Sequence, residues 1–203
     1  MYKERYAEAL KAIDELLLGD KDVILVAVEG RCASGKTTFA DYLQQQYGCN
    51  LFHMDDFFPQ AYQRTEERMH EVGGNVDRER FKEEVLDPVL KHQNVVYRAF
   101  DCHTMDFKEA VLKPFTRLNV VEGAYSQHPY FGDVYDLKIF MDISPEEQLD
   151  NIRRRDPESV EAYVNRWIPK EENYFRMFDI MEGNLIVDWD QNILPEAAPS
   201  EAE

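Results

Sequence analysis

The chain has 203 residues, of which 44% are hydrophobic and 31% charged, and its formal net charge at pH 7 is −17. This composition is that of a globular protein, and the excess of acid argues against nucleic acid or an anionic membrane as a partner, because phosphate surfaces require clustered Lys and Arg. The odd number of cysteines, three, favours reduced thiols and a cytoplasmic location, and no apolar run or signal peptide suggests a membrane segment.

The first half of the chain alternates predicted helices and strands. Residues 2–18 carry apolar side chains at three-to-four spacing, which predicts an amphipathic N-terminal helix. The apolar, β-branched run at 23–28 predicts a buried parallel strand, and residues 37–47 predict a helix. A short strand is predicted at 51–54. The segment 57–77 has no clean periodicity, and a loop of that length is usually functional or mobile.

The second half continues the alternation. Residues 78–91 predict a helix, and residues 94–114 predict a β-hairpin or small flap. The elements expected after it are a strand at 118–121, a strand at 137–141, a helix capped by Ser144 and ending near Asp156, a helix at 159–181 kinked at Pro169, and a strand at 185–187. Strands alternating with helices predict an α/β fold with a mostly parallel sheet covered on both faces. Residues 191–203 predict a disordered acidic tail.

The segment EGRCASGKTT at 29–38 has the spacing of a phosphate-binding loop: Gly30, four residues, then Gly35-Lys36-Thr37. Backbone N–H groups of such a loop wrap phosphates, the lysine reaches the terminal phosphates, and the threonine hydroxyl can ligate Mg²⁺. A strand before it and a helix after it direct the positive end of the helix dipole at the anion. The predicted nucleotide-binding residues are Gly30, Arg31, Cys32, Ala33, Ser34, Gly35, Lys36, Thr37 and Thr38.

Acidic residues follow two of the predicted strands. In open parallel sheets ligands sit beyond the carboxyl ends of the strands, so Asp55 and Glu122 are expected near the loop. Asp55 could take the proton from an attacking hydroxyl and lie near Mg²⁺, or it could simply form a solvated turn. Glu122 stands at the Walker-B position, where an acid holds Mg²⁺ directly or through water; the alternative is a surface acid.

Three consecutive arginines, Arg153, Arg154 and Arg155, lie on the helix that Ser144 opens. They span roughly 200° of the helix, so at least one must face any site above it. Guanidinium groups suit the spread charge of a transferring phosphoryl group. The alternative is a solvated basic face paired with nearby acids. With Lys36 and Asp55, the arginines make up the predicted catalytic set.

Together these segments resemble the uridine kinase-like P-loop nucleoside kinases, which include uridine-cytidine and nicotinamide riboside kinases, with phosphoribulokinase and pantothenate kinase as relatives. The matching segments are EGRCASGKTT, MDDFF at 54–58, NVDRERF at 75–81, VYRAFDCHT at 96–104, VVEGAY at 120–125 and DISPEEQLDNIRRRD at 142–156. They occur in the family's order and cover most of the chain from about 23 to 188.

The resemblance implies one kinase domain over residues 1–190, with an N-terminal helix within 1–19. Its core is a three-layer α/β/α arrangement around a five-stranded parallel sheet. The hairpin at 94–114 then corresponds to the family's flap, and residues 150–160 correspond to a helical lid.

The resemblance also implies roles for individual residues. Asp55 activates the 5′-hydroxyl of the acceptor, and Asp77 holds its ribose. The flap residues that surround the base correspond to Tyr97, Phe100 and His103. Metal binding falls to Thr37, Glu122 and Asp55, and the lid that closes over the transferring phosphate corresponds to Arg153, Arg154 and Arg155.

The implied cofactors are ATP or GTP and Mg²⁺, and the implied partner is a small-molecule nucleoside, uridine or cytidine first; a homo-oligomer is compatible with the sequence. Two alternatives stay open. One is a kinase for another small hydroxylated acceptor, such as nicotinamide riboside, pantothenate or a sugar. The other is a nucleotide-dependent regulatory module, although the guanine-reading Asn-Lys-x-Asp and switch Asp-x-x-Gly patterns are absent from the chain.

Overall fold

The computed structural model describes residues 5–188; the predicted tail at 191–203 and the first residues of the predicted helix 2–18 lie outside them. Its centre is a five-stranded parallel sheet in the order β2-β5-β1-β6-β7. The strands are β1 (Ile24–Gly30), β2 (Asn50–His53), β5 (Leu118–Glu122), β6 (Leu137–Asp142) and β7 (Leu185–Asp188). All five predicted strands are present, and the α/β fold class with its parallel sheet is confirmed.

Side chains that alternate along β1 separate two hydrophobic layers, one on each face of the sheet. Ile24 and Val26 belong to the layer formed with α2 and α3, whereas Leu25 and Ala27 belong to the opposite layer. The covering helices are α2 (Ala7–Leu18) and α3 (Lys36–Tyr47) on the first face, and on the second face α9 (Ile168–Met177) and the continuous helix α5 (Arg78–Phe81), η3 (Lys82–Leu86, π-helical) and α6 (Asp87–Leu90). Every residue of β1 is buried, as expected for a central parallel strand.

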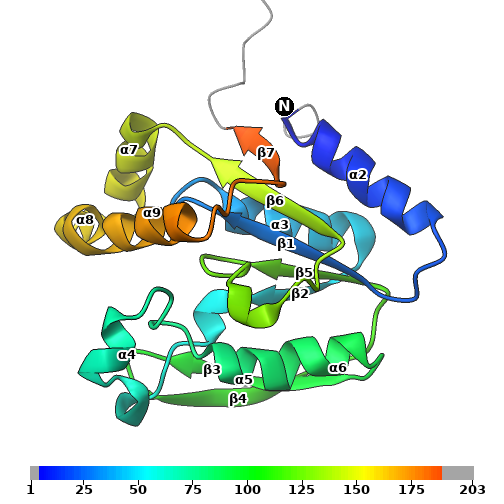
Figure 1. Ribbon diagram of the computed structural model, residues 1–203, viewed down its shortest axis with the longest axis horizontal. Coiled ribbons are helices and arrows are strands. Elements are labelled where there is room, and N and C mark those ends of the chain that lie inside the picture. The colour runs from blue at the N-terminus through cyan, green and yellow to red at the C-terminus, as the bar shows by residue number, and fades with distance from the viewer. Residues whose placement is uncertain (1–4, 189–203) are drawn as a thin grey trace, which may run out of the picture.

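Helix α7 (Pro145–Arg155) begins as predicted. The hydroxyl of Ser144 accepts a hydrogen bond from the backbone N–H of Glu147, and Pro145 occupies the first turn, where its missing N–H has no consequence. The helix ends with all three arginines in its last turn. Figure 1 shows α7, α8 and α9 grouped at one end of the sheet.

The last helical segment is shorter than predicted. It consists of α8 (Val160–Ala162), the π-helical η5 (Tyr163–Trp167) and α9, and it ends at Met177 instead of Met181. Phe178 leaves the helical conformation and Asp179 has a φ of 48°, so the backbone turns away there. The π-helical turn lies directly before Pro169, where the sequence predicted a kink, and π-turns are a known cause of bent helices.

The predicted hairpin is present as β3 (Val95–Asp101) and β4 (Asp106–Lys113), an antiparallel pair outside the main sheet. The segment 57–77, predicted without regular structure, contains η2 (Ala61–Gln63) and α4 (Glu66–His70). Both are too short to show a periodicity in the sequence; Thr65 caps α4 by accepting from Arg68 N. The other short helices are η1 (Met54–Asp56) and η4 (Pro129–Phe131). None of the helices within 5–188 has the length and apolar character to cross a bilayer.

Candidate active site

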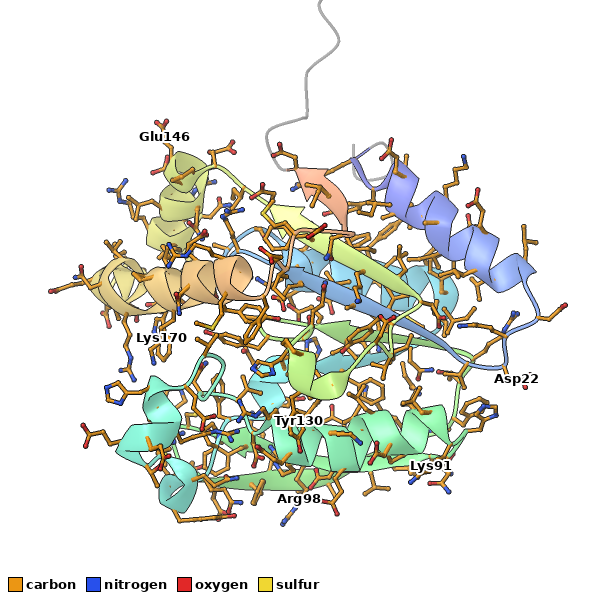
Figure 2. The ribbon with its side chains drawn as sticks, in the orientation of Figure 1. Asp22, Lys91, Arg98, Tyr130, Glu146 and Lys170 are labelled. Atoms are coloured by element: carbon orange, nitrogen blue, oxygen red, sulfur yellow. The ribbon has the colours of Figure 1, made fainter. Side chains whose placement is uncertain are left out.

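A cavity of about 850 Å³ opens beyond the carboxyl ends of the central strands. Its walls come from the glycine loop (residues 30–38), η1, the segment before α5, the segment after β5, the end of α7 and the helix from α8 to α9. The cavity therefore lies at the edge of the sheet where a parallel fold places its ligands. Figure 2 shows Lys170 extending from α9 toward α4, where its Nζ donates to the carbonyl of Met69 at 3.4 Å, so that a side-chain contact links these two helices.

The glycine loop is a tight ring closed by its own lysine. Lys36 Nζ donates to the carbonyls of Gly30 and Arg31, both at 2.8 Å. Gly30 has a φ of 139°, and a Cβ there would lie 2.2 Å from the carbonyl oxygen of Met141, so only glycine fits. Gly35 (φ 90°) and Ala33 (φ 61°) are also left-handed. Such a conformation turns successive N–H groups toward one side, which is the geometry of an anion-binding loop.

Residues from strand β6 and helix α9 hold the outside of this loop. The guanidinium of Arg31 pairs with Asp142 and Glu172, so Arg31 is not among the residues that line the cavity. The N–H of Cys32 donates to the Glu171 carboxylate at 2.9 Å. Burial raises the pKa of the Cys32 thiol to about 12, which makes it an inert thiol. The loop backbone is thus fixed before any ligand binds.

The other loop residues take different positions. Ser34 is buried, and its hydroxyl has no hydrogen-bond partner within the described structure. Thr37 and Thr38 both line the cavity at the start of α3, where the helix dipole is positive. Six of the nine predicted nucleotide-binding residues therefore line the cavity, whereas Gly30, Arg31 and Ser34 do not.

Glu122, at the end of β5, connects two neighbouring side chains. Its carboxylate accepts from the Thr37 hydroxyl at 3.0 Å and contacts His53 Nδ1 at 2.8 Å. Burial opposes its ionisation, but hydrogen bonds from His53 and the charge of Lys36 outweigh it and hold the pKa of Glu122 below its ordinary value. The same contact raises the pKa of His53. The pair is therefore a carboxylate beside an imidazole that favours its charged form.

Asp55 lies in η1 and lines the same cavity. Burial, and then the charge of Glu122, raise the pKa of its carboxyl, while Lys36 opposes the shift. A carboxylate whose pKa is raised is a better proton acceptor than an ordinary aspartate. The next residue, Asp56, is directed elsewhere: its carboxylate accepts from the Tyr97 hydroxyl at 3.1 Å, and it does not line the cavity.

The donor groups in the cavity fit a hard cation such as Mg²⁺. Within residues 5–188 there is no cluster of three His, Cys, Asp or Glu side chains able to hold a metal without other ligands. Mg²⁺ does not need one, because it keeps several waters and takes one or two carboxylates together with substrate phosphates. The hydroxyl of Thr37 and the carboxylate of Glu122 are oxygen groups in contact with each other, with Asp55 on the same cavity wall.

The three arginines separate in space. Arg154 and Arg155 line the cavity, whereas Arg153 does not and pairs with the exposed Asp150. Arg155 Nη2 donates to the Tyr163 hydroxyl on the following helix. Two of the three predicted arginines therefore reach the site, as a run that spans much of a helix circumference requires.

Apart from Asp55, the predicted acceptor residues do not line the cavity. The buried Asp77 caps α5 by accepting from Arg80 N, and it also accepts from Gln63 Nε2 at 3.0 Å. The hairpin aromatics belong to the core: the ring of Tyr97 stacks on Phe57 at 5.4 Å, and Phe100 contacts Phe107 edge-on. His103 is exposed in the hairpin turn. The residues that do line the cavity include Phe58, Asn75, Val76, Tyr125 and Trp167.

Comparison with solved structures identifies the fold. Similar chains include a possible uridine kinase from Bacillus stearothermophilus (TM-score 0.70, 16% identity, 92% of this chain and 99% of that one). They also include a candidate fructose transport system kinase from Silicibacter sp. TM1040 (TM-score 0.64, 22% identity, 90% of this chain and 98% of that one). A third is D-glycerate 3-kinase from Cryptococcus neoformans var. grubii serotype A (TM-score 0.54, 14% identity, 84% of this chain and 87% of that one). The chain has a P-loop kinase fold. No protein-family model and no curated protein matches its sequence.

Within this P-loop kinase fold, two buried acids beside the glycine loop were missed by the sequence reasoning. Glu29 accepts from the N–H of Gly30 and from the Tyr174 hydroxyl, and burial raises its pKa to about 7. Its position at the end of β1 repeats the strand-end pattern that singled out Glu122, so a signal existed. Glu171 lines the cavity and holds Cys32 N, and burial raises its pKa. It offered no signal, because 139 residues separate the two partners.

Proposed function

We propose that this protein transfers the γ-phosphoryl group of ATP to the 5′-hydroxyl of a nucleoside, with uridine or cytidine as the first candidates. The observation that carries the proposal is the presence in one cavity of Lys36, Thr37 and two carboxyl groups, Asp55 and the buried Glu122. Phosphoryl transfer requires a phosphate cradle, oxygen ligands for a cation, and a carboxylate near the acceptor. The kinase names of the structural neighbours support the reaction class, and the sequence resemblance supports the nucleoside.

Each group has a distinct task in this reaction. The N–H groups of the glycine loop and Lys36 bind the phosphates, and Lys36 exchanges its two loop carbonyls for phosphate oxygens. Thr37 and Glu122 would hold Mg²⁺, which when bound neutralises charge on the phosphates. Asp55 accepts the proton of the acceptor hydroxyl as that oxygen attacks. Arg154 and Arg155 face the charge that spreads over the transferring group.

The walls of the cavity serve to exclude water. Phe58, Val76, Tyr125 and Trp167 supply apolar surface to the cavity that Asp55 also lines. With water displaced from these walls by the acceptor, the attacking oxygen is the acceptor hydroxyl, and ATP is protected from hydrolysis.

A second acceptor class, sugars or sugar acids, is favoured by one observation. Tyr97 and Phe100, which the family resemblance places around a nucleoside base, are buried in the core and away from the cavity. An acceptor without a base would need no contact with them. Two of the structural neighbours are named as kinases of fructose transport and of D-glycerate.

A panel of acceptors tests the proposal directly. Purified protein is incubated with labelled ATP or GTP, Mg²⁺ and one acceptor at a time: uridine, cytidine, nicotinamide riboside, pantothenate, fructose and glycerate. We expect transfer to the pyrimidine nucleosides to exceed transfer to the others. Transfer to a sugar alone would replace the nucleoside by the second class, and nucleotide hydrolysis without any acceptor-dependent transfer would exclude a kinase.

The variant Asp55→Asn tests the role of the proton acceptor. Loss of a general base reduces turnover by roughly 10²–10⁴-fold, and we expect nucleotide binding by calorimetry to remain close to that of the wild type. Asp56→Asn is the matched control, because this neighbouring carboxylate contacts Tyr97 outside the cavity. Near wild-type turnover in Asp55→Asn would remove Asp55 from the mechanism.

A further inference from the structure

Helix α7 contacts the glycine loop through two side-chain amides. Gln148 Nε2 donates to the carbonyl of Cys32 and Asn151 Nδ2 donates to the carbonyl of Ala33, both at 3.0 Å. The two residues are three apart on the helix and so lie on one face. They bind consecutive carbonyls of the loop, and such carbonyls point away from the phosphate side when the N–H groups point toward it.

Asn151 makes a second contact at the other end of its amide. Its Oδ1 accepts from Arg154 Nη2 at 3.0 Å, while its Nδ2 remains on the loop carbonyl. A single planar amide therefore connects the backbone of Ala33 to the guanidinium of Arg154. All three residues line the cavity.

The neighbouring arginines lack this connection. Arg153 pairs with the exposed Asp150 outside the cavity, and Arg155 donates to Tyr163 on the following helix. Within the part of the chain that the structure describes, Arg154 is the lid arginine whose guanidinium is tied to the glycine loop through one side chain.

We propose that Asn151 is a positioning residue that holds Arg154 beside the glycine loop, and that Arg154 is the lid arginine that contacts the transferring group. The inference rests on the proposed phosphotransfer. Holding a flexible arginine in place before the reaction removes the loss of rotamer freedom that would otherwise accompany its contact with phosphate.

The test compares Asn151→Leu, Arg154→Ala and the double variant. We expect each single change to lower kcat by about 10–100-fold, the scale on which a misplaced charged group slows an enzyme, with little change in the KM of the acceptor. The double variant should be no slower than Arg154→Ala alone, because Asn151 then has no arginine to position. Independent, multiplying losses would overturn the proposal.

A binding measurement separates positioning from a general effect on folding. By calorimetry, the ratio of Mg·ATP to Mg·ADP affinity should fall equally in Asn151→Leu and Arg154→Ala, because both remove the contact with the γ-phosphate. Asp150→Asn, a surface change on the same helix, should leave the ratio unchanged. An unchanged ratio in either of the first two variants would contradict the assignment.

Two further outcomes are informative. If Asn151→Leu fails to fold, the comparison of Arg154→Ala with Arg153→Ala still decides, since both side chains are exposed; the former must lose at least tenfold more activity. If the wild type transfers no phosphoryl group to any acceptor, the proposed function fails. If the wild type is active but the losses multiply, only this inference fails.

Discussion

Removing the buried charge next to the glycine loop should change the pH dependence of stability. Glu29 is fully buried at the end of β1, and its carboxylate accepts from Gly30 N, Gln127 N and the Tyr174 hydroxyl. Burial raises its pKa from 4.5 to about 7, against the opposing charge of Lys36. The variant Glu29→Gln keeps a carbonyl acceptor in the same place but cannot ionise.

The size of the effect follows from the shift. In the native state Glu29 binds its proton more tightly than in the unfolded chain, so its contribution favours folding fully below pH 4.5 and is lost as pH rises through 7. A shift of this size corresponds to about 3 kcal/mol of unfolding free energy at 1.36 kcal/mol per pKa unit. The variant Glu29→Gln cannot ionise at this position, so its stability does not fall in this way as the pH rises. It also has one acceptor oxygen fewer, a difference on the order of 1–3 kcal/mol that does not vary with pH.

Urea unfolding of the wild type and Glu29→Gln at pH 5, 6, 7 and 8 measures this effect. The difference in unfolding free energy should move by about 2.5 kcal/mol in favour of the variant between pH 5 and 8, most of it below pH 7.5. Glu83→Gln is the control, because it removes the same charge from an exposed position. A difference that stays constant over this range would show that Glu29 is ionised throughout, and the argument from burial would be wrong.

Two more changes test the geometry of the site. Gly30→Ala should lower the unfolding free energy by roughly 2–4 kcal/mol in urea, since the new Cβ would meet the backbone of Met141 at 2.2 Å with φ at 139°; an unchanged midpoint would mean that β6 can move aside. Glu122→Gln should lower the pKa of His53 in an NMR titration, because the hydrogen bond to this carboxylate raises it now. A His53 titration that stays in place would contradict the pairing.

Elements with local signals were predictable from the sequence. The strand at 23–28 was identified because every side chain of a central parallel strand is buried, which demands an unbroken apolar run. Ser144 and Pro145 marked the start of α7 because capping chemistry depends on adjacent residues. The short α4 escaped, since five residues cannot display a helical period.

The side chains around the loop depended on contacts between distant parts of the chain. Nothing near Asn151 in the sequence indicates that its amide meets Ala33, 118 residues away, although Arg154 beside it was identified. The hairpin aromatics illustrate the opposite difficulty. Tyr97 and Phe100 have the composition of a base-binding surface and equally that of a core, and only their packing on Phe57 and Phe107 assigns them to the core.

The acidity of the protein and a polyphosphate site are compatible because the acids near the loop are locally compensated. Glu122 contacts His53 and Thr37, and Glu171 accepts a backbone N–H. Burial raises the pKa values of Asp55 and Glu171, because a low-dielectric environment disfavours the charged form of a carboxyl group. A bound phosphate therefore meets loop N–H groups and cations at short range, whereas most of the net charge of −17 lies on the surface and is screened within about 10 Å by salt.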